Sequence, residues 1–289
     1  MTHAPKVDGL MAAGLTTATQ GAAHQAGRTA STALVTQITS RDNPLVKELH
    51  RLTSDAAAYR KQGRIWLEGD HLCRAVLQRG QKPSLAVFAE SNWLFANVEY
   101  RECAIKTIVL TDPLFHHISS LESPGNMAFV MDLPHGLQVQ PQASTVILDR
   151  VQDAGNVGSI LRSAAAFGVN QVIALKGTAA LWSPKVLRAG MGAHFGLHLI
   201  EGLEVADLEP LKVPIIVTSS HVGEMLQNQR LPVPCAWALG HEGQGVCDAL
   251  LARAALSVRI GQPGGEESLN VAAAAAICLH AGSLALQLQ

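Results

Sequence analysis

Short apolar runs recur along the second half of the chain, each of strand length and each followed by a polar or glycine-rich loop. They are Thr145–Leu148, Val172–Leu175, Leu197–Ile200, Ile215–Ser219, Ala236–Leu239 and Leu256–Ile260. Successive positions are apolar, so both faces of each strand should be buried, which is typical of parallel strands. Helical patterns lie between them, at Ser159–Phe167 before Gly168 and at Lys185–Ala189 after Pro184. The pattern predicts an α/β fold whose parallel sheet is covered on both faces and carries a site at the carboxyl ends of its strands.

Strand and helix patterns also alternate in the first half of the chain. Strand candidates are Arg64–Glu68, Leu85–Ala89, Ile105–Leu110 and Met127–Met131, and helix candidates are Leu45–Leu52, His71–Gln78 and Leu114–Leu121. This alternation predicts a small α/β layer domain. The turn formers of Pro134–Ala143 indicate a linker. We therefore divide the chain into a disordered tail (1–35), a first domain (36–133), a linker (134–144) and a second domain (145–289).

Composition narrows the class of protein. The chain has 289 residues, is 48% hydrophobic and 16% charged, and has a net charge of −1, so it can build a core and is not basic throughout. Its five cysteines form no C-x-x-C pair, which favours a reducing compartment such as the cytoplasm. We expect no membrane span, because no apolar run is long enough, and no metal site, because no ligand spacing is visible. The alternative interpretation of the tail is an organelle transit peptide, although Lys6 and Arg28 are its only basic residues.

Three loops after apolar runs combine glycine with polar side chains. The first holds Asn156 and Arg162, the second Glu242, and the third Ser268 and Asn270. Polar groups at a helix N-terminus can hold small polar ligands, and an arginine can bind a phosphate with two hydrogen bonds. Each loop also has an ordinary interpretation. These are a Gly/Asn turn with a solvated arginine, a flexible surface turn, and an N-cap by Ser268 of a helix over Ala272–Leu279.

In their order and spacing, the three loops resemble the motifs of the SpoU/TrmH class of RNA methyltransferases, within the SPOUT superfamily. They read D-x-x-N-x-G-x-I-x-R-x-A at Asp153–Ala164, L-G-x-E-G-x-G at Leu239–Gly245, and G-x-E-S-L-N-V within Gly264–Val271. The resemblance covers Thr145–Leu288. The first domain resembles the small substrate-binding domain, similar to a ribosomal protein, that often precedes this catalytic domain. The chain departs from the family pattern at Ala154 and Gly261, where proline is usual, and at Gly190, where serine is usual.

The resemblance implies a sheet tied into a trefoil knot, a homodimer, and S-adenosylmethionine as the donor for methylation of a ribose 2′-hydroxyl in RNA. It assigns catalytic positions to Arg162, Asn156, Glu242, Ser268 and Asn270. Cofactor contacts are expected at Gly240, Ile260, Leu269, Thr218 and Gly245. Ribosomal RNA is the first choice of substrate, because the first domain resembles that of enzymes modifying ribosomal RNA, and transfer RNA is the second. Arg162 either helps to remove the hydroxyl proton or only binds the neighbouring phosphate, since arginine is a poor base at its usual pKa.

A cluster of cations in the first domain is the predicted RNA contact. We call Arg41, Lys47, Arg60 and Arg64 the basic stretch; Arg51 and Lys61 lie among them. Such a cluster can meet phosphates, or it can be an ordinary solvated helix face. Two other classes of protein stay open. One is an inactive RNA-binding relative with the same fold, and the other is a nicotinamide dehydrogenase, against which the missing G-x-G-x-x-G argues.

Overall fold

The first sheet is mixed and has the strand order β1-β4-β3-β5-β2. The structure is a computed structural model that describes residues 34–219, 223–264 and 268–287. Elements of the first half are β1 (Leu34–Ile38), α1 (Pro44–Ser54), α2 (Ala58–Gln62), β2 (Arg64–Glu68), α3 (Asp70–Gln78), β3 (Leu85–Ala89), α4 (Glu90–Trp93), α5 (Val98–Arg101), β4 (Lys106–Leu110), α6 (Asp112–Ile118) and β5 (Met127–Asp132). Residues 1–33 of the predicted tail lie outside the described residues. Leu34 and Val35, which the sequence placed in that tail, begin β1.

Helix α1 illustrates how the sequence sets local structure in this half. The Asn43 side chain accepts a hydrogen bond of 2.9 Å from the Leu45 amide, and Pro44 occupies the first turn, where its missing N–H costs nothing. Val46 and Leu49, three residues apart, are buried on one face. The cap and the apolar spacing therefore agree, and the predicted helix is confirmed.

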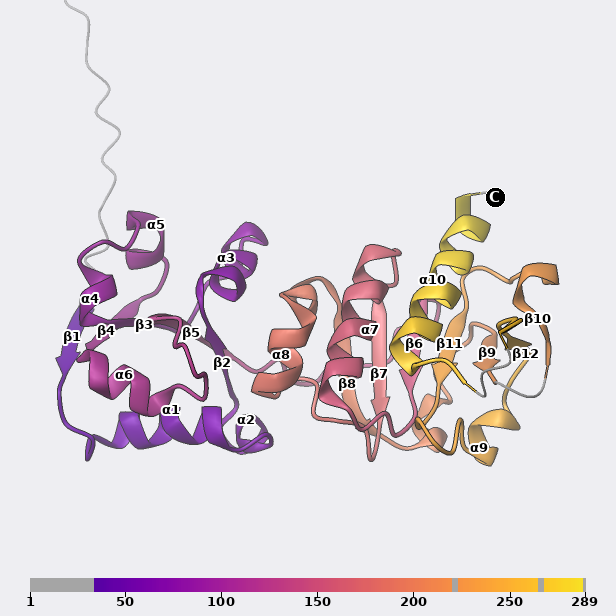
Figure 1. The fold of residues 1–289 in the computed structure, drawn as a ribbon, viewed down its shortest axis with the longest axis horizontal. Helices are drawn as coiled ribbons and strands as arrows, with labels where there is room; N and C mark the ends of the chain where they lie inside the picture. The colour runs from indigo at the N-terminus through magenta and orange to yellow at the C-terminus, as the bar shows by residue number, and fades with distance from the viewer. Residues whose placement is uncertain (1–33, 220–222, 265–267, 288–289) are drawn as a thin grey trace, which may run out of the picture. The chain divides into compact units, whose positions relative to one another are not determined.

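The second sheet is parallel throughout and has the order β10-β12-β9-β11-β6-β7-β8 (Figure 1). Its elements are β6 (Thr145–Leu148), α7 (Ala154–Ala166), β7 (Gln171–Leu175), α8 (Pro184–Gly190), β8 (His198–Leu203), β9 (Ile215–Thr218), β10 (Glu224–Met225), β11 (Ala236–Leu239), α9 (Asp248–Leu251), β12 (Leu256–Arg259) and α10 (Val271–Gln287). The predicted parallel sheet is confirmed. The short strand β10 was not predicted, and α7 begins before the predicted Ser159.

Both faces of this sheet are buried, as the uninterrupted apolar runs required. Val146 and Leu148 pack into the cluster that contains α7, α8 and α10, whereas Ile147 packs with Leu208 and Leu250 on the opposite face. Because side chains alternate along a strand, a strand that is apolar at every position needs cover on both sides. Burial of each such side chain contributes about 1.5–3 kcal/mol.

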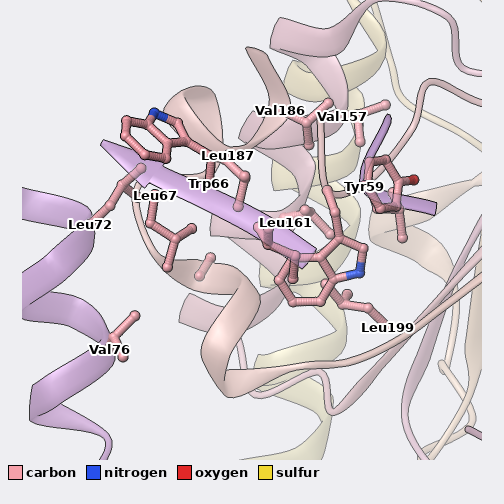
Figure 2. Packing of buried hydrophobic residues seen from close by; sticks show 14 of the residues in the cluster. Tyr59, Trp66, Leu67, Leu72, Val76, Val157, Leu161, Val186, Leu187 and Leu199 are labelled. Atoms are coloured by element: carbon pink, nitrogen blue, oxygen red, sulfur yellow. The ribbon is translucent and has the colours of Figure 1, made fainter. Parts of the chain in front are cut away.

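One hydrophobic cluster joins the two sheets. Trp66 and Leu72 of the first half belong to the same buried cluster as Leu161 and Leu187 of the second half (Figure 2). Within Ala33–Gln289 the chain forms one compact unit, so the division at the linker stays a prediction. Among the described helices, none combines the length and the apolar character that a bilayer crossing requires.

A polar contact lies beside this shared core. Glu201 of β8 accepts a hydrogen bond of 2.5 Å from the Tyr59 hydroxyl and one of 2.9 Å from Arg60 Nε, and it forms an ion pair with the same guanidinium. Burial raises the pKa of the Tyr59 phenol first, and the neighbouring Glu201 carboxylate raises it further, so the hydroxyl stays a donor. Arg60 therefore helps to hold the first sheet against the second.

Candidate functional site

The carboxyl ends of neighbouring parallel strands gather the polar loops at one edge of the second sheet. Strands β12, β9, β11 and β6 are consecutive in the sheet, and their register pairs Thr218 with Val258, and Leu239 with Leu148. The loops after β6, β11 and β12 are the three predicted motifs. A crevice at this edge is where open α/β sheets bind ligands.

Three side chains from these loops form one hydrogen-bonded network. Asn156 of α7 donates from Nδ2 to Glu242 Oε1 at 3.2 Å, and its Oδ1 accepts from Asn270 Nδ2 at 3.0 Å. The three residues are separated by 86 and 114 positions in the chain. The structure thus brings together three of the five predicted catalytic residues, one from each motif.

The network is built on helix ends. Asp153 caps α7 by accepting a hydrogen bond of 2.7 Å from the Asn156 amide. Asn270 accepts from the amides of Ala272 at 2.9 Å and Ala273 at 3.3 Å at the start of α10. The prediction that Ser268 caps this helix is therefore wrong. Asn270 is closer to the first turn and takes that place, which leaves Ser268 exposed two residues before the cap.

Glu242 is held as a carboxylate. Partial burial raises its pKa, but hydrogen bonds from its own backbone amide, from the Asn156 side chain and from the Asp153 and Gln152 backbone outweigh burial, so the pKa lies below the ordinary value. The side chain is exposed overall, so it keeps its negative charge at neutral pH while it orients the Asn156 amide.

The second motif is a tight loop in which backbone packs on backbone. A Cβ at Gly240 would lie 2.1 Å from the Gly245 carbonyl carbon, so only glycine fits there. His241 and Gly245 exchange hydrogen bonds of 3.0 and 2.8 Å, and His241 Nδ1 accepts from the Gly243 amide at 3.0 Å. The loop is a surface turn whose backbone is tied together by these hydrogen bonds.

Two residues that sequence reasoning missed hold this loop against the first one. Arg150 donates to Gln244 Oε1 at 2.9 Å and to the Gly245 carbonyl at 3.3 Å. Its Nε also donates to Asp149 Oδ1 at 2.9 Å, and Asp149 Oδ2 accepts from the Cys247 amide at 2.6 Å. Burial raises the pKa of Asp149, but the hydrogen bonds from Arg150 and Cys247 lower it by more, so the pKa lies below the ordinary value. The sequence signal that could have identified this pair is the position of Asp149, an acidic residue directly after the apolar strand β6.

The predicted cofactor residues lie at the ends of three adjacent strands. Thr218 ends β9 and donates to the Ala238 carbonyl at 3.3 Å, Gly240 follows β11, and Ile260 follows β12. Leu269 is 39% exposed, and Ile260 is partly buried. The atoms nearest to a Cβ built at Gly261 belong to the Met225 and Gln227 side chains, at 3.6 Å or more. Close packing therefore does not explain why glycine stands here in place of the usual proline.

Arg162 is separated from the Asn156 network. Both side chains belong to α7, and six residues along a helix correspond to about 9 Å and a rotation of about 240°. Asn156 contacts Glu242, whereas Arg162 is exposed on a different side of the helix. It lines a hollow of about 360 Å³, with His71 and Arg74 of α3, Arg79 directly after that helix, and the segment 190–193 that begins at the end of α8. We call this hollow the Arg162 groove.

The wall of the groove is fixed by close packing. A Cβ at Gly158 of α7 would lie 2.3 Å from the Ala189 Cβ of α8, so the two helices touch. A Cβ at Gly190 would lie 2.5 Å from the His194 ring, which is buried and donates from Nε2 to the Leu181 carbonyl at 2.9 Å. The departure from serine at Gly190 thus has a physical reason, because the imidazole occupies that space.

Most cations of the basic stretch form ion pairs with carboxylates. Lys47 pairs with Asp42 at 3.1 Å, Arg64 with Glu48 at 2.8 Å, and Arg60 with Glu201. Arg41 is exposed. Arg41 lies before α1, and the other three cations lie in α1, in α2 and at the start of β2, each with a carboxylate partner.

Comparisons with known proteins agree with this arrangement. The model of the SpoU rRNA methylase family matches residues 143–280. A Bacillus subtilis protein named 23S rRNA (guanosine(2553)-2′-O)-methyltransferase RlmP is 29% identical over 250 residues, which are 84% of this chain and 98% of that protein.

Solved structures extend the likeness to both halves of the chain. A TrmH-family protein from Porphyromonas gingivalis matches with a TM-score of 0.71 and 29% identity, over 82% of this chain and 96% of that one. An AdoMet-bound rRNA methyltransferase from Sinorhizobium meliloti matches with a TM-score of 0.75 over 87% of this chain and 98% of that one. At 24% identity, the second likeness establishes the fold alone.

Proposed function

The chain belongs to the SpoU/TrmH class of RNA methyltransferases, and from this premise we propose that it transfers a methyl group from S-adenosylmethionine to a ribose 2′-hydroxyl of ribosomal RNA. The observation that carries the proposal is the network of Asn156, Glu242 and Asn270. It joins the three motifs at the strand edge where this fold binds ligands. Ribosomal RNA is supported by the relative that the chain covers almost completely, which is named for that substrate.

The strand-end residues fit S-adenosylmethionine. The side chains of Ile260 and Leu269 are apolar, and Gly240 has none, so this part of the edge suits a purine held by backbone groups. The Glu242 carboxylate, kept ionised by its hydrogen bonds, favours a positively charged ligand nearby. We assign Gly240, Ile260 and Leu269, with Thr218 and Gly245 beside them, to cofactor binding.

The reaction requires alignment and removal of one proton. Bound S-adenosylmethionine would supply a methyl group already activated by its sulfonium. For the 2′-oxygen to accept that methyl group, the hydroxyl would have to pass its proton to the adjacent phosphate or to solvent. Arg162 lies near that hydroxyl in our proposal and, together with the adjacent phosphate, eases the departure of the proton. Its position in a hollow with other cations suits contact with the RNA backbone.

The remaining polar residues position the reactants. Asn156 is held from both sides, by Glu242 and by Asn270, so its amide has a fixed orientation. Glu242 fixes the second loop, and Asn270 fixes the start of α10. Ser268 is exposed in the same loop, and we assign it to contact with the substrate.

We also propose a cytoplasmic homodimer with a trefoil-knotted second sheet. Helix α10 leaves Ile277, Leu284 and Leu286 between 41% and 52% exposed, which supports a subunit interface on this helix. The contacts of the basic stretch with RNA stay a prediction, because ion pairs engage most of these cations.

Mapping of 2′-O-methyl sites tests the proposed function. Ribosomal and transfer RNA from cells with and without this gene would be compared at nucleotide resolution. The proposal expects one site in ribosomal RNA to disappear and to return with the wild-type gene but not with Arg162→Ala. A site lost only from transfer RNA would reject the proposed substrate, and unchanged maps would reject the proposed activity.

A further inference from the structure

The Arg162 groove collects positive charge from parts of the chain that are distant in sequence. Arg74 comes from α3, Arg79 follows the last residue of that helix, and Arg162 comes from α7. His71 and Gln78 add further polar groups, and none of the described residues that line the hollow is acidic. Such a hollow attracts an anion, because like charges held together in a concave surface raise the local positive potential.

The cations are held in place. Arg74 forms an ion pair with Asp70 one turn earlier in α3, and Asp70 Oδ1 also accepts a hydrogen bond of 2.7 Å from the Tyr100 hydroxyl. The Arg79 guanidinium lies against the backbone of Gly196, where a Cβ would be 2.2 Å from its Nη1. Both side chains are therefore partly ordered before any ligand binds, which lowers the entropic cost of binding.

The two walls of the groove approach closely. A Cβ at Gly192 would lie 2.5 Å from the Ala75 Cβ, so α3 meets the segment after α8 without a side chain between them. Trp66 and Leu72 of the first half share a buried hydrophobic cluster with Leu187 of the second half (Figure 2). The groove is thus a fixed feature of the described unit, formed only where the first half of the chain packs on the second.

We propose that this groove binds the RNA phosphodiester backbone next to the ribose that is methylated, with Arg74 and Arg79 as the phosphate contacts and Arg162 at the end nearest the reaction. The inference rests on the proposed function and adds to it a route for the substrate that does not depend on the basic stretch. Three arginines without an acidic neighbour in the lining fit a chain of phosphates, because guanidinium binds phosphate oxygens in pairs.

Binding of a labelled single-stranded RNA to the full-length protein, measured over a series of salt concentrations, tests the proposal. The double variant Arg74→Gln with Arg79→Gln is compared with Lys106→Gln with Lys212→Gln, which removes two exposed positive charges outside the groove. The groove variant should lower the slope of log K against log salt by about 1.4. Its affinity at about 0.1 M salt should fall on the order of 10- to 50-fold. The control should stay within about twofold of the wild type.

Two further arms keep the result interpretable. Arg74→Lys with Arg79→Lys preserves charge and should retain most of the salt slope, whereas an effect as large as that of the glutamine pair would indicate damaged packing and reject phosphate binding. Inorganic phosphate at an equal phosphate concentration should not displace RNA; displacement would assign the groove to a free anion. A groove variant that binds RNA like its control would overturn the inference even if the wild type transfers methyl groups. Absence of methyl transfer by the wild type would instead reject the proposed function.

Discussion

The basic stretch and the Arg162 groove both gather cations, but they differ in what surrounds these charges. In the basic stretch, Lys47, Arg60 and Arg64 each have a carboxylate partner. Among the described residues, Arg74 is the one groove arginine with a carboxylate partner, and the lining holds no acid. Three of the four cations of the basic stretch are therefore compensated, whereas Arg79 and Arg162 of the groove are left to act on a ligand. Positive potential is a property of the folded surface and not of a sequence window.

Removal of the Arg162 guanidinium should give the largest effect. Arg162→Ala is expected to lower the single-turnover rate of methyl transfer by about 10²- to 10⁴-fold, which is the usual contribution of a group that assists proton transfer. Saturating RNA separates this loss from weaker binding. A rate equal to that of the wild type would end the catalytic role. A loss that saturating RNA restores would reduce Arg162 to a phosphate contact like Arg74.

The buried His194 beneath the groove should make stability depend on pH. Burial lowers its pKa from 6.5 to about 4, against a smaller opposing effect of the Leu181 carbonyl. Between these pH values the unfolded chain binds a proton that the folded chain does not, so stability falls as the pH decreases from about 6.5 to 4. The loss reaches about 3 kcal/mol and then levels off. Urea unfolding at several pH values measures it.

His194→Gln supplies the matched comparison for that titration. The variant lacks the imidazole that packs on Gly190, so it should be less stable at neutral pH. Its stability should nevertheless change less between pH 6.5 and 4, because the titrating group is gone. Equal pH dependence in the two proteins would show that other groups, and not the histidine under the groove, control acid unfolding.

Glu201 should matter for stability more than for RNA. Glu201→Gln removes the charge that holds Tyr59 and Arg60, and we expect a loss of about 1–3 kcal/mol in the free energy of unfolding. RNA affinity should change by about twofold or less. A large gain in RNA affinity would instead show that Arg60, once released, is a nucleic-acid contact, and would restore the predicted role of the basic stretch.

Lys47→Gln should have the smallest effect. Its ion pair with Asp42 joins side chains that are 61% and 94% exposed, so stability should change by about 0.5 kcal/mol or less. RNA affinity should fall by less than about threefold, as expected for one exposed charge. A loss comparable to that of the groove variant would remove the difference between the two regions.

Local patterns predicted most of the fold, and long-range contacts account for what they missed. The strands Arg64–Glu68, Leu85–Ala89 and Ala236–Leu239 have the predicted bounds, because apolar runs and turn residues define them locally. The sequence predicted an N-cap before α10 but assigned it to Ser268, whereas Asn270 is the cap, because more than one polar residue there can accept the hydrogen bond. The Arg60–Glu201 pair spans 141 positions, and no local signal announces such a partner.

The candidate site shows the same division. The motifs identified Asn156, Glu242 and Asn270, which the structure joins in one network. They did not identify Arg150, whose bonds to the second loop depend on strand order, or the groove, which needs both halves of the chain. Asn156 and Arg162 belong to the same motif, but the rotation along α7 places them on different sides of the helix.

Transfer of a labelled methyl group from S-adenosylmethionine to ribosomal RNA, followed by digestion to nucleosides, tests the central claim most directly. We predict that the wild-type protein places the label on a 2′-O-methylnucleoside and that Arg162→Ala, with RNA saturating, places far less. Label found only on a base, or no label in RNA to which the protein demonstrably binds, would contradict the assignment of this strand edge to ribose methylation.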